Sequence, residues 1–151
     1  HEGTLGEMHA PETHLLPLVL QVAAGRKKHI SVFGDDYPTP DGTCVRDYVH
    51  VMDIVEAHIL AMENLTITNK SQVFNIGNKK GFSVNQIIQM AKEITKVDIP
   101  FKTQGRRKGD PAELIADNKK IMNLLNWNPK YSDLETIIKS AWNWEKTLKI
   151  K

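Results

Sequence analysis

The chain has 151 residues, of which 40% are hydrophobic and 25% are charged, and its formal net charge is +2. This composition is typical of one ordinary globular domain with a workable core, and the small net charge gives little support for nucleic-acid binding. The single cysteine, Cys44, excludes an internal disulfide and a zinc-cysteine site and suits a reducing cytosol. The apolar run from Leu15 to Ala24 is interrupted by Gln21 and is too short to span a bilayer.

The N-terminal half of the chain predicts two helices and two strands. Thr13 can cap a helix that continues to about Ala24, and Ile30 to Phe33 has the pattern of a short apolar strand. Residues 34–43 contain two prolines and two glycines and predict an ordered loop. Tyr48 to Val51 is predicted as a second strand, after which Asp53 caps a helix that reaches about Asn64.

The C-terminal half continues the alternation of strands and helices. Val73 to Gly77 predicts a buried strand, and Ser83 with Gln86 has the spacing of a capping box for a helix that runs to about Thr95. The later elements are a strand at Ile99–Lys102, an extended segment at Leu114–Ala116, a helix capped by Asp117 that ends near Asn126, and a helix from Leu134 to about Leu148 that opens with a second capping box, Ser132 to Glu135. The alternation indicates an α/β fold with about five helices and short strands.

The most informative residue is Arg46, which follows the turn-rich loop and stands two positions before the predicted strand at Tyr48 to Val51. An arginine in such a place can hold a phosphate, because its guanidinium stays charged and offers a planar fork of donors that matches phosphate oxygens. On residue chemistry alone, however, an Arg-Asp pair such as Arg46 and Asp47 is more often a structural ion pair than a ligand site.

The run from Phe33 to Asp53 resembles the segment typical of UDP-glucose 4-epimerases in the extended short-chain dehydrogenase/reductase family. The segments Pro11 to Pro17 and Gly105 to Pro111 resemble two further family segments, in the same order and at similar spacing, so the likeness covers nearly the whole chain. It implies an enzyme that interconverts UDP-glucose and UDP-galactose by NAD-dependent oxidation and re-reduction at C4. It also implies a homodimer in the cytoplasm.

Two features of that family are not found in this sequence. A dinucleotide-binding enzyme carries a glycine fingerprint at a helix N-terminus, and the family adds a Tyr-x-x-x-Lys pair. The residues four positions after the three tyrosines are Asp41, Met52 and Glu135, and no glycine spacing fits the fingerprint. We therefore expect residues 1–151 to be the C-terminal, UDP-sugar-binding domain, with NAD bound by an N-terminal Rossmann domain outside this chain. No catalytic residue and no metal site is expected here.

The resemblance also implies roles for individual residues. Arg46 and Arg107 would hold the diphosphate, and the carboxylate of Asp110 would accept a hydrogen bond from a ribose hydroxyl. The backbone amides of His14 and Leu15 would serve a phosphate, because unpaired amides and the helix dipole at a helix start favour an anion.

The uridine side of the expected site comes from two other segments. Ser31 to Phe33 matches the strand whose main chain reads the uracil edge, with Phe33 packed near the base and Val84 lining the same pocket. Some family members have a tyrosine where Leu114 stands, which leaves the sugar preference open. A 4-epimerase for UDP-N-acetylglucosamine or UDP-xylose is therefore one alternative, and a nucleotide-binding module without chemistry is another.

The tryptophans and two of the histidines are assigned to packing rather than to a site. Trp142 and Trp144 are two positions apart on a helix and face different ways, and Trp127 beside Asn-Pro is predicted to be a packing anchor. His50 and His58 lie in or beside apolar segments and are expected to be core or surface residues.

Overall fold

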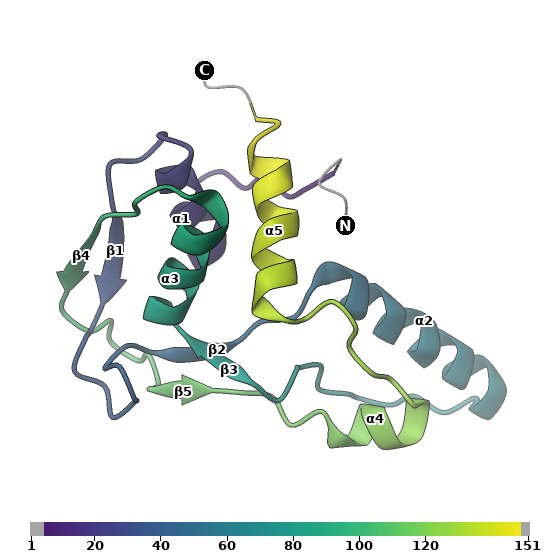
Figure 1. Ribbon diagram of the computed structural model, residues 1–151. Coiled ribbons are helices and arrows are strands. Elements are labelled where there is room, and N and C mark those ends of the chain that lie inside the picture. The colour runs from purple at the N-terminus through teal and green to yellow at the C-terminus, as the bar shows by residue number, and fades with distance from the viewer. Residues whose placement is uncertain (1–4, 149–151) are drawn as a thin grey trace.

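The computed structural model describes residues 5–148 and has five helices and five short strands in that range (Figure 1). This arrangement confirms the predicted α/β fold. The elements in chain order are α1 Leu15–Ala23, β1 Ile30–Phe33, β2 Val45–Asp47, α2 Val51–Thr68, β3 Gly81–Ser83, α3 Val84–Thr95, β4 Phe101–Gln104, β5 Glu113–Leu114, α4 Lys119–Leu125 and α5 Leu134–Glu145.

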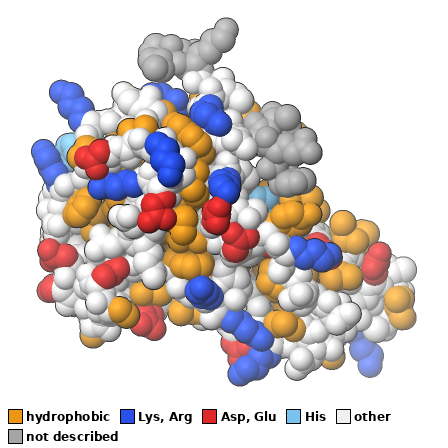
Figure 2. All heavy atoms as spheres, in the orientation of Figure 1, with side chains coloured by type: hydrophobic (Ala, Val, Ile, Leu, Met, Phe, Trp, Pro, Cys, Tyr) orange, Lys and Arg blue, Asp and Glu red, His pale blue; other side chains and the backbone are white. Residues whose placement is uncertain are grey.

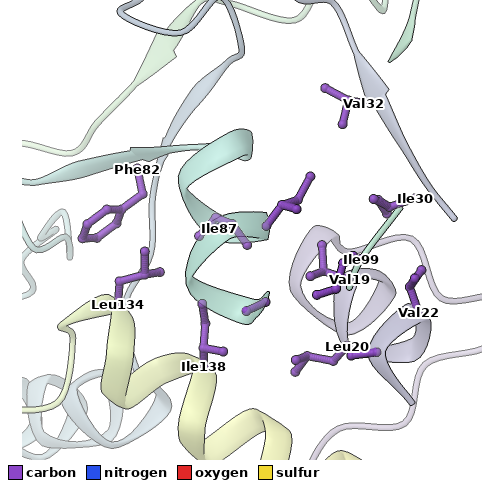
Figure 3. Close-up of a cluster of buried hydrophobic side chains, with 13 residues drawn as sticks. Val19, Leu20, Val22, Ile30, Val32, Phe82, Ile87, Ile99, Leu134 and Ile138 are labelled. Carbon is purple, nitrogen blue, oxygen red and sulfur yellow. The ribbon is translucent and has the colours of Figure 1, made fainter. Parts of the chain in front are cut away.

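The main core lies where α1, α3 and α5 pack against one another, with β1 at its side. Figure 3 shows Leu134 and Ile138 of α5 beside Ile87 of α3, with Val19 and Leu20 on α1. All five side chains are buried. Burying one such side chain stabilises a fold by roughly 1.5–3 kcal/mol, so these helices hold the domain together.

The strands form two small sheets. In the first, β1 pairs with β4 in parallel, and in the second the order is β3-β2-β5, with β3 antiparallel and β5 parallel to β2. The predicted strand at Tyr48–Val51 is wrong. The strand ends at Asp47, and α2 begins at Val51 because His50 caps it through Nδ1, which accepts the backbone N–H of Met52 at 3.1 Å.

The predicted buried strand at Val73–Gly77 is also wrong, because the structure assigns no strand there. Val73 is 81% exposed, and its carbonyl accepts a hydrogen bond from Nζ of Lys120 at 2.7 Å. A strand needs a neighbouring strand for its backbone groups, and within residues 5–148 none pairs with this segment. Phe74 and Ile76 instead pack against a second, smaller core of Ala57, Ile121, Leu125 and Trp127.

The helix ends confirm some of the predicted caps and correct others. The capping box of α3 is confirmed, with Ser83 and Gln86 bonded reciprocally. Asp133 caps α5 in place of Ser132, and α5 ends at Glu145 rather than Leu148. The remaining corrections are that His14 rather than Thr13 is the residue before α1, that Asn118 rather than Asp117 precedes α4, and that α2 extends to Thr68.

A buried carboxylate ties the start of α2 to the segment before α5. Asp53 is 0% exposed, and its two oxygens accept the backbone N–H groups of Lys130 at 2.8 Å and Tyr131 at 2.9 Å and the hydroxyl of Ser132. Its carbonyl accepts the indole N–H of Trp127 at 2.9 Å. Trp127 is 1% exposed, which confirms it as a packing anchor.

His50 belongs to the same network. Its N–H donates to the hydroxyl of Ser132 at 2.9 Å, and its Nε2 lies 3.0 Å from the hydroxyl of Ser140. Burial lowers the pKa of His50 below its ordinary value, so the imidazole is neutral at pH 7 and serves as a cap. Of the two places predicted for His50, core or surface, the structure shows the core, since His50 is buried.

We expect Asp53→Ala to destabilise the chain by about 3 kcal/mol or more, because it removes the fully buried acceptor of three hydrogen bonds. Asp133→Ala is the matched control, since it removes an exposed carboxylate that only caps α5 and should cost about 1 kcal/mol. Urea unfolding of both variants measures the difference. Equal losses would show that the Asp53 network contributes no more than an ordinary cap.

One face of α2 is apolar and exposed. Val51, Val55, Ile59 and Met62 are spaced by four, four and three positions, so they share a face, and all are exposed. We call these residues the α2 outer face. In Figure 1 α2 extends away from the three-helix core, and Figure 2 shows hydrophobic side chains at the surface over that end of the molecule. Contiguous apolar surface of this kind favours association.

We therefore expect the 151-residue chain to self-associate in sedimentation experiments. The double change Val55→Glu and Ile59→Glu should shift the population toward monomer, because each carboxylate would have to lose its water in a packed contact. Val97→Glu introduces the same charge at an exposed apolar residue on another part of the chain and serves as the control. A concentration-independent monomer with a sharp melt would contradict this expectation.

Candidate functional site

Two of the expected site residues, Phe33 and Arg107, lie near the carboxyl ends of β1 and β4. The two strands run parallel in the register Phe33 opposite Gln104, and Gly34 N–H continues the ladder by donating to the Gln104 carbonyl at 2.9 Å. The carboxyl ends of parallel strands meet at the same edge, which is where α/β folds place ligands. Arg107, three residues beyond β4, therefore lies beside Phe33.

The guanidinium of Arg107 stacks on the ring of Phe33, with its Cζ 3.8 Å from the ring centroid. Such a cation–π contact contributes about 0.5–1 kcal/mol at an exposed position and uses the face of the guanidinium. The N–H groups at its edge stay available for an anion. Ser31 lies two residues earlier on β1, half-buried and paired with Lys102 of β4.

Arg46 lies in the middle of β2, opposite Phe82 of β3 and Leu114 of β5. Its Nη1 donates to the Val45 carbonyl at 2.8 Å, and its Nη2 lies 3.6 Å from Oδ1 of Asp110. The structure thus brings together two residues that are distant in sequence and that were both predicted for the site. Leu114 is exposed beside them.

The neighbouring Asp47 is not the ion-pair partner of Arg46. Its carboxylate accepts the backbone N–H groups of Asn78 at 3.1 Å and Ala116 at 3.2 Å, so it joins β2 to two loops. Arg46 pairs with Asp110 instead. The alternative of a purely local Arg-Asp pair is therefore wrong.

A short turn links Arg107 to Asp110. The Asp110 N–H donates to the Arg107 carbonyl at 3.2 Å, and Gly109 has a φ of 89°, a left-handed conformation that glycine adopts without strain. This turn presents Arg107 toward Phe33 on one side and Asp110 toward Arg46 on the other. The four residues form the candidate site.

Val84 lies near the same sheet, at the start of α3. Its N–H donates to the Cys44 carbonyl at 3.1 Å, two residues before Arg46, and its half-buried side chain packs against the main core. A lining position for Val84 is compatible with this geometry and stays a prediction.

The structure bears on the His14 amide, whereas the expected role of the Leu15 amide stays a prediction. Oε1 of Glu12 accepts the backbone N–H of Thr13 at 2.8 Å and of His14 at 2.7 Å, so a carboxylate already occupies the His14 amide that was expected to serve a phosphate. Burial would raise the pKa of Glu12, but the hydrogen bonds from His14 and Thr13 outweigh it and lower that pKa. Within residues 5–148, no hydrogen bond, ion pair or ring contact joins His14 or Leu15 to the four-residue site.

Two contributors to the site were not predicted from the sequence. Asp41 accepts hydrogen bonds from the N–H and hydroxyl of Thr43 at 3.0 and 2.7 Å and from the hydroxyl of Ser83, and so joins the loop before β2 to the start of α3. Arg106 pairs with Asp36. The only sequence signal for Asp41 was its place in a Pro-Asp-Gly turn, which predicts a turn but not a partner 42 residues away.

A tyrosine close to Arg46 is held in its protonated form. Burial raises the pKa of Tyr48 to about 12, so this tyrosine, two residues from Arg46, stays protonated at neutral pH. No cluster of three or more His, Cys, Asp or Glu residues suited to a metal ion is found among residues 5–148. None of the helices in that range is long and apolar enough to cross a membrane.

Comparison with known proteins gives consistent matches along nearly the whole chain. Residues 1–140 match the family model described as GDP-mannose 4,6 dehydratase. A UDP-glucose 4-epimerase of Halalkalibacterium halodurans is 51% identical over 144 residues, which are 95% of this chain and 43% of that protein.

Solved structures agree with the sequence matches. A crystal structure of UDP-glucose 4-epimerase has a TM-score of 0.93 at 50% identity and covers 97% of this chain and 44% of its own. The UDP-glucose-4-epimerase of Stenotrophomonas maltophila, solved with bound NAD and formylated UDP-arabinopyranose, has a TM-score of 0.92 at 40% identity, with 96% and 43% coverage.

The chain therefore spans less than half the length of these relatives. The matched part of this chain includes Arg46, Arg107 and Asp110, and the two solved structures share its fold over at least 96% of its length. Sequence and fold together show that the chain belongs to the family described as GDP-mannose 4,6 dehydratase, within the extended short-chain dehydrogenase/reductases and beside the UDP-glucose 4-epimerases.

Proposed function

We propose that residues 1–151 form the UDP-sugar-binding domain of an NAD-dependent UDP-glucose 4-epimerase. The complete protein would interconvert UDP-glucose and UDP-galactose by oxidation and re-reduction at C4. The observation that carries the proposal is the convergence of Arg46, Arg107, Asp110 and Phe33 from three separate segments. Relatives that are 50–51% identical to this chain over at least 95% of its length are named UDP-glucose 4-epimerase.

The residues have the chemistry that a nucleoside diphosphate requires. Arg46 and Arg107 carry fixed positive charge and planar donors for the diphosphate oxygens. Asp110 is half-exposed, and its carboxylate can accept a hydrogen bond from a ribose hydroxyl while it stays near Arg46. Phe33 offers an aromatic surface for the base, and the backbone of Ser31 on β1 offers groups for its polar edge.

The residues of this chain do not fit NAD. Dinucleotide binding uses a glycine-rich turn whose free amides open a helix. Here side chains bond amides in the first turns of α3 and α5, Ser83 that of Gln86 and Asp133 that of Thr136, and no glycine spacing in the sequence fits the dinucleotide fingerprint. We therefore assign NAD binding to a part of the complete protein outside this chain, together with the acid–base groups.

Binding through uridine and diphosphate has a specific use in this reaction. A 4-epimerase has to reduce its keto-sugar from the face opposite to the one it oxidised, so the hexose must turn while it is held. Contacts far from the reacting carbon supply affinity without fixing the sugar ring. Arg46, Arg107 and Asp110 would give such contacts to the nucleotide end of the substrate.

We also propose that the complete protein is a cytoplasmic homodimer whose dimer contacts lie outside this chain. A reducing compartment is supported by Cys44, which is free and buried.

The 151-residue chain by itself should show no epimerase activity, even with NAD added, because it has no Tyr-x-x-x-Lys pair. The assay follows conversion of UDP-galactose by rigorously purified chain, with the complete protein as the positive control. Turnover above background would contradict the assignment of the chemistry to another part of the protein.

In the complete protein, Arg46→Lys or Arg107→Ala should weaken UDP binding by about 1.5–3 kcal/mol, because each removes a charge-assisted hydrogen-bonding fork. Retention of NAD should be unchanged in both variants. Calorimetry with UDP measures the first effect, and the absorbance of bound cofactor measures the second. Lys27→Ala, a change to an exposed cation just after α1, is the control. Unchanged UDP binding in both arginine variants would remove them from the site.

A further inference from the structure

Two consecutive arginines stack on two aromatic rings at the edge of the candidate site. The Cζ of Arg106 lies 4.3 Å from the ring centroid of Tyr37, and that of Arg107 lies 3.8 Å from the ring centroid of Phe33. Both rings belong to the end of β1 and the loop that follows it. The two cation–π contacts therefore pack the loop after β4 against the end of β1 and the loop after it.

Arg106 is held by more than its ring. Its Nε donates to Oδ1 of Asp36 at 2.6 Å, and its Nη2 donates to the backbone carbonyl of the same residue. An exposed ion pair alone contributes little. Here, however, a carboxylate, a carbonyl and the face of Tyr37 fix the guanidinium in three directions, so its orientation is determined.

The close approach of these groups depends on Gly34. Its φ of 84° is left-handed, and a Cβ there would lie 2.5 Å from Cε2 of Tyr37 and 2.8 Å from Cγ of Arg106. Any side chain would therefore push apart the two groups that stack. Gly34 also continues the β1–β4 ladder through its bond to Gln104, so the packing of Arg106 begins where the strand pairing ends.

The electrostatic environments of the two arginines differ. Asp36 balances the charge of Arg106, whereas among residues 5–148 no carboxylate lies within 4 Å of Arg107. Two adjacent guanidinium groups repel each other, and a counter-charge on one of them reduces that repulsion. Arg107 therefore keeps an uncompensated charge over Phe33, which an incoming anion can use.

We infer that Arg106 is a positioning residue, which clamps the loop after β4 onto Asp36 and Tyr37 and thereby holds Arg107 over Phe33. Arg106 acts through Arg107 and does not contact the ligand. The inference rests on the proposed function, in that the ligand of Arg107 is the diphosphate of a UDP-sugar.

A double-mutant cycle on the complete protein, with UDP as the probe, separates this role from direct contact. Arg106→Lys keeps the charge but loses the fork and the flat stacking face, and it should raise the Kd for UDP about tenfold. In the Arg107→Ala background the same change should alter Kd by less than about twofold, because the residue it positions is gone. Additive effects would overturn the inference.

A measurement without ligand tests the clamp on its own. In the free protein the ring current of Phe33 should shift the side-chain proton resonances of Arg107 upfield, and Arg106→Lys, Asp36→Asn and Gly34→Ala should each move them toward random-coil values. Unchanged resonances in all three variants would overturn the clamp. If the wild type shows these shifts but does not bind UDP, the clamp holds and the proposed function fails.

Lys108→Gln is the matched control. It removes a cation from the same exposed loop, and no hydrogen bond or ion pair to Lys108 is found in the part of the chain that the structure describes. It should change the Kd for UDP by less than about twofold and leave the Arg107 resonances in place. An effect equal to that of Arg106→Lys would mean that loop charge alone accounts for the result and would overturn the inference.

Discussion

The buried carboxylate of Asp53 sets the relation between the two ends of this fold. Its oxygens hold the backbone at Lys130 and Tyr131, directly before α5, while its own backbone lies in the first turn of α2. Because α5 packs against α1 and α3, these bonds link the start of α2 to the three-helix core. The cost of burying the charge is offset by three hydrogen bonds to its oxygens, since a buried carboxylate is stable only when its oxygens are bonded.

The candidate site depends on the three-helix core indirectly, through the strand that precedes α3. Residue Ser83 ends β3 and caps α3, and β3 pairs with β2, so the helix core fixes the strand that carries Arg46. The loop between β1 and β2 is held in turn by Asp41, which bonds to Ser83 and Thr43. Arg46 and Phe33 therefore come from strands of two different sheets that are connected through one loop and one helix start. The rigid elements position the site, while the loops supply its charged groups.

Local signals in the sequence predicted local structure well. The capping box at Ser83 was predicted because both of its bonds lie within four residues, and Trp127 was predicted as an anchor from its apolar bulk beside a helix end. The box expected at Ser132 failed because Asp53, far away in the chain, uses that hydroxyl. The strand at Val73 failed for the same kind of reason, since pairing depends on a partner that the segment itself does not contain. Arg46, Arg107 and Asp110 were found through a motif, whereas Asp36 and Asp41 bond to residues that no local pattern reveals.

The position of Asp110, 3.6 Å from Nη2 of Arg46, makes it a built-in counter-ion for that arginine. At a distance the pair is close to neutral, so Arg46 adds little to the field that an approaching anion would meet. Among residues 5–148 Arg107 has no such counter-ion, and its field extends into solvent, where dissolved salt screens it over about 10 Å at 0.1 M ionic strength. Dissolved salt would therefore weaken the attraction of an anion to this surface mainly through Arg107, and less through the paired Arg46.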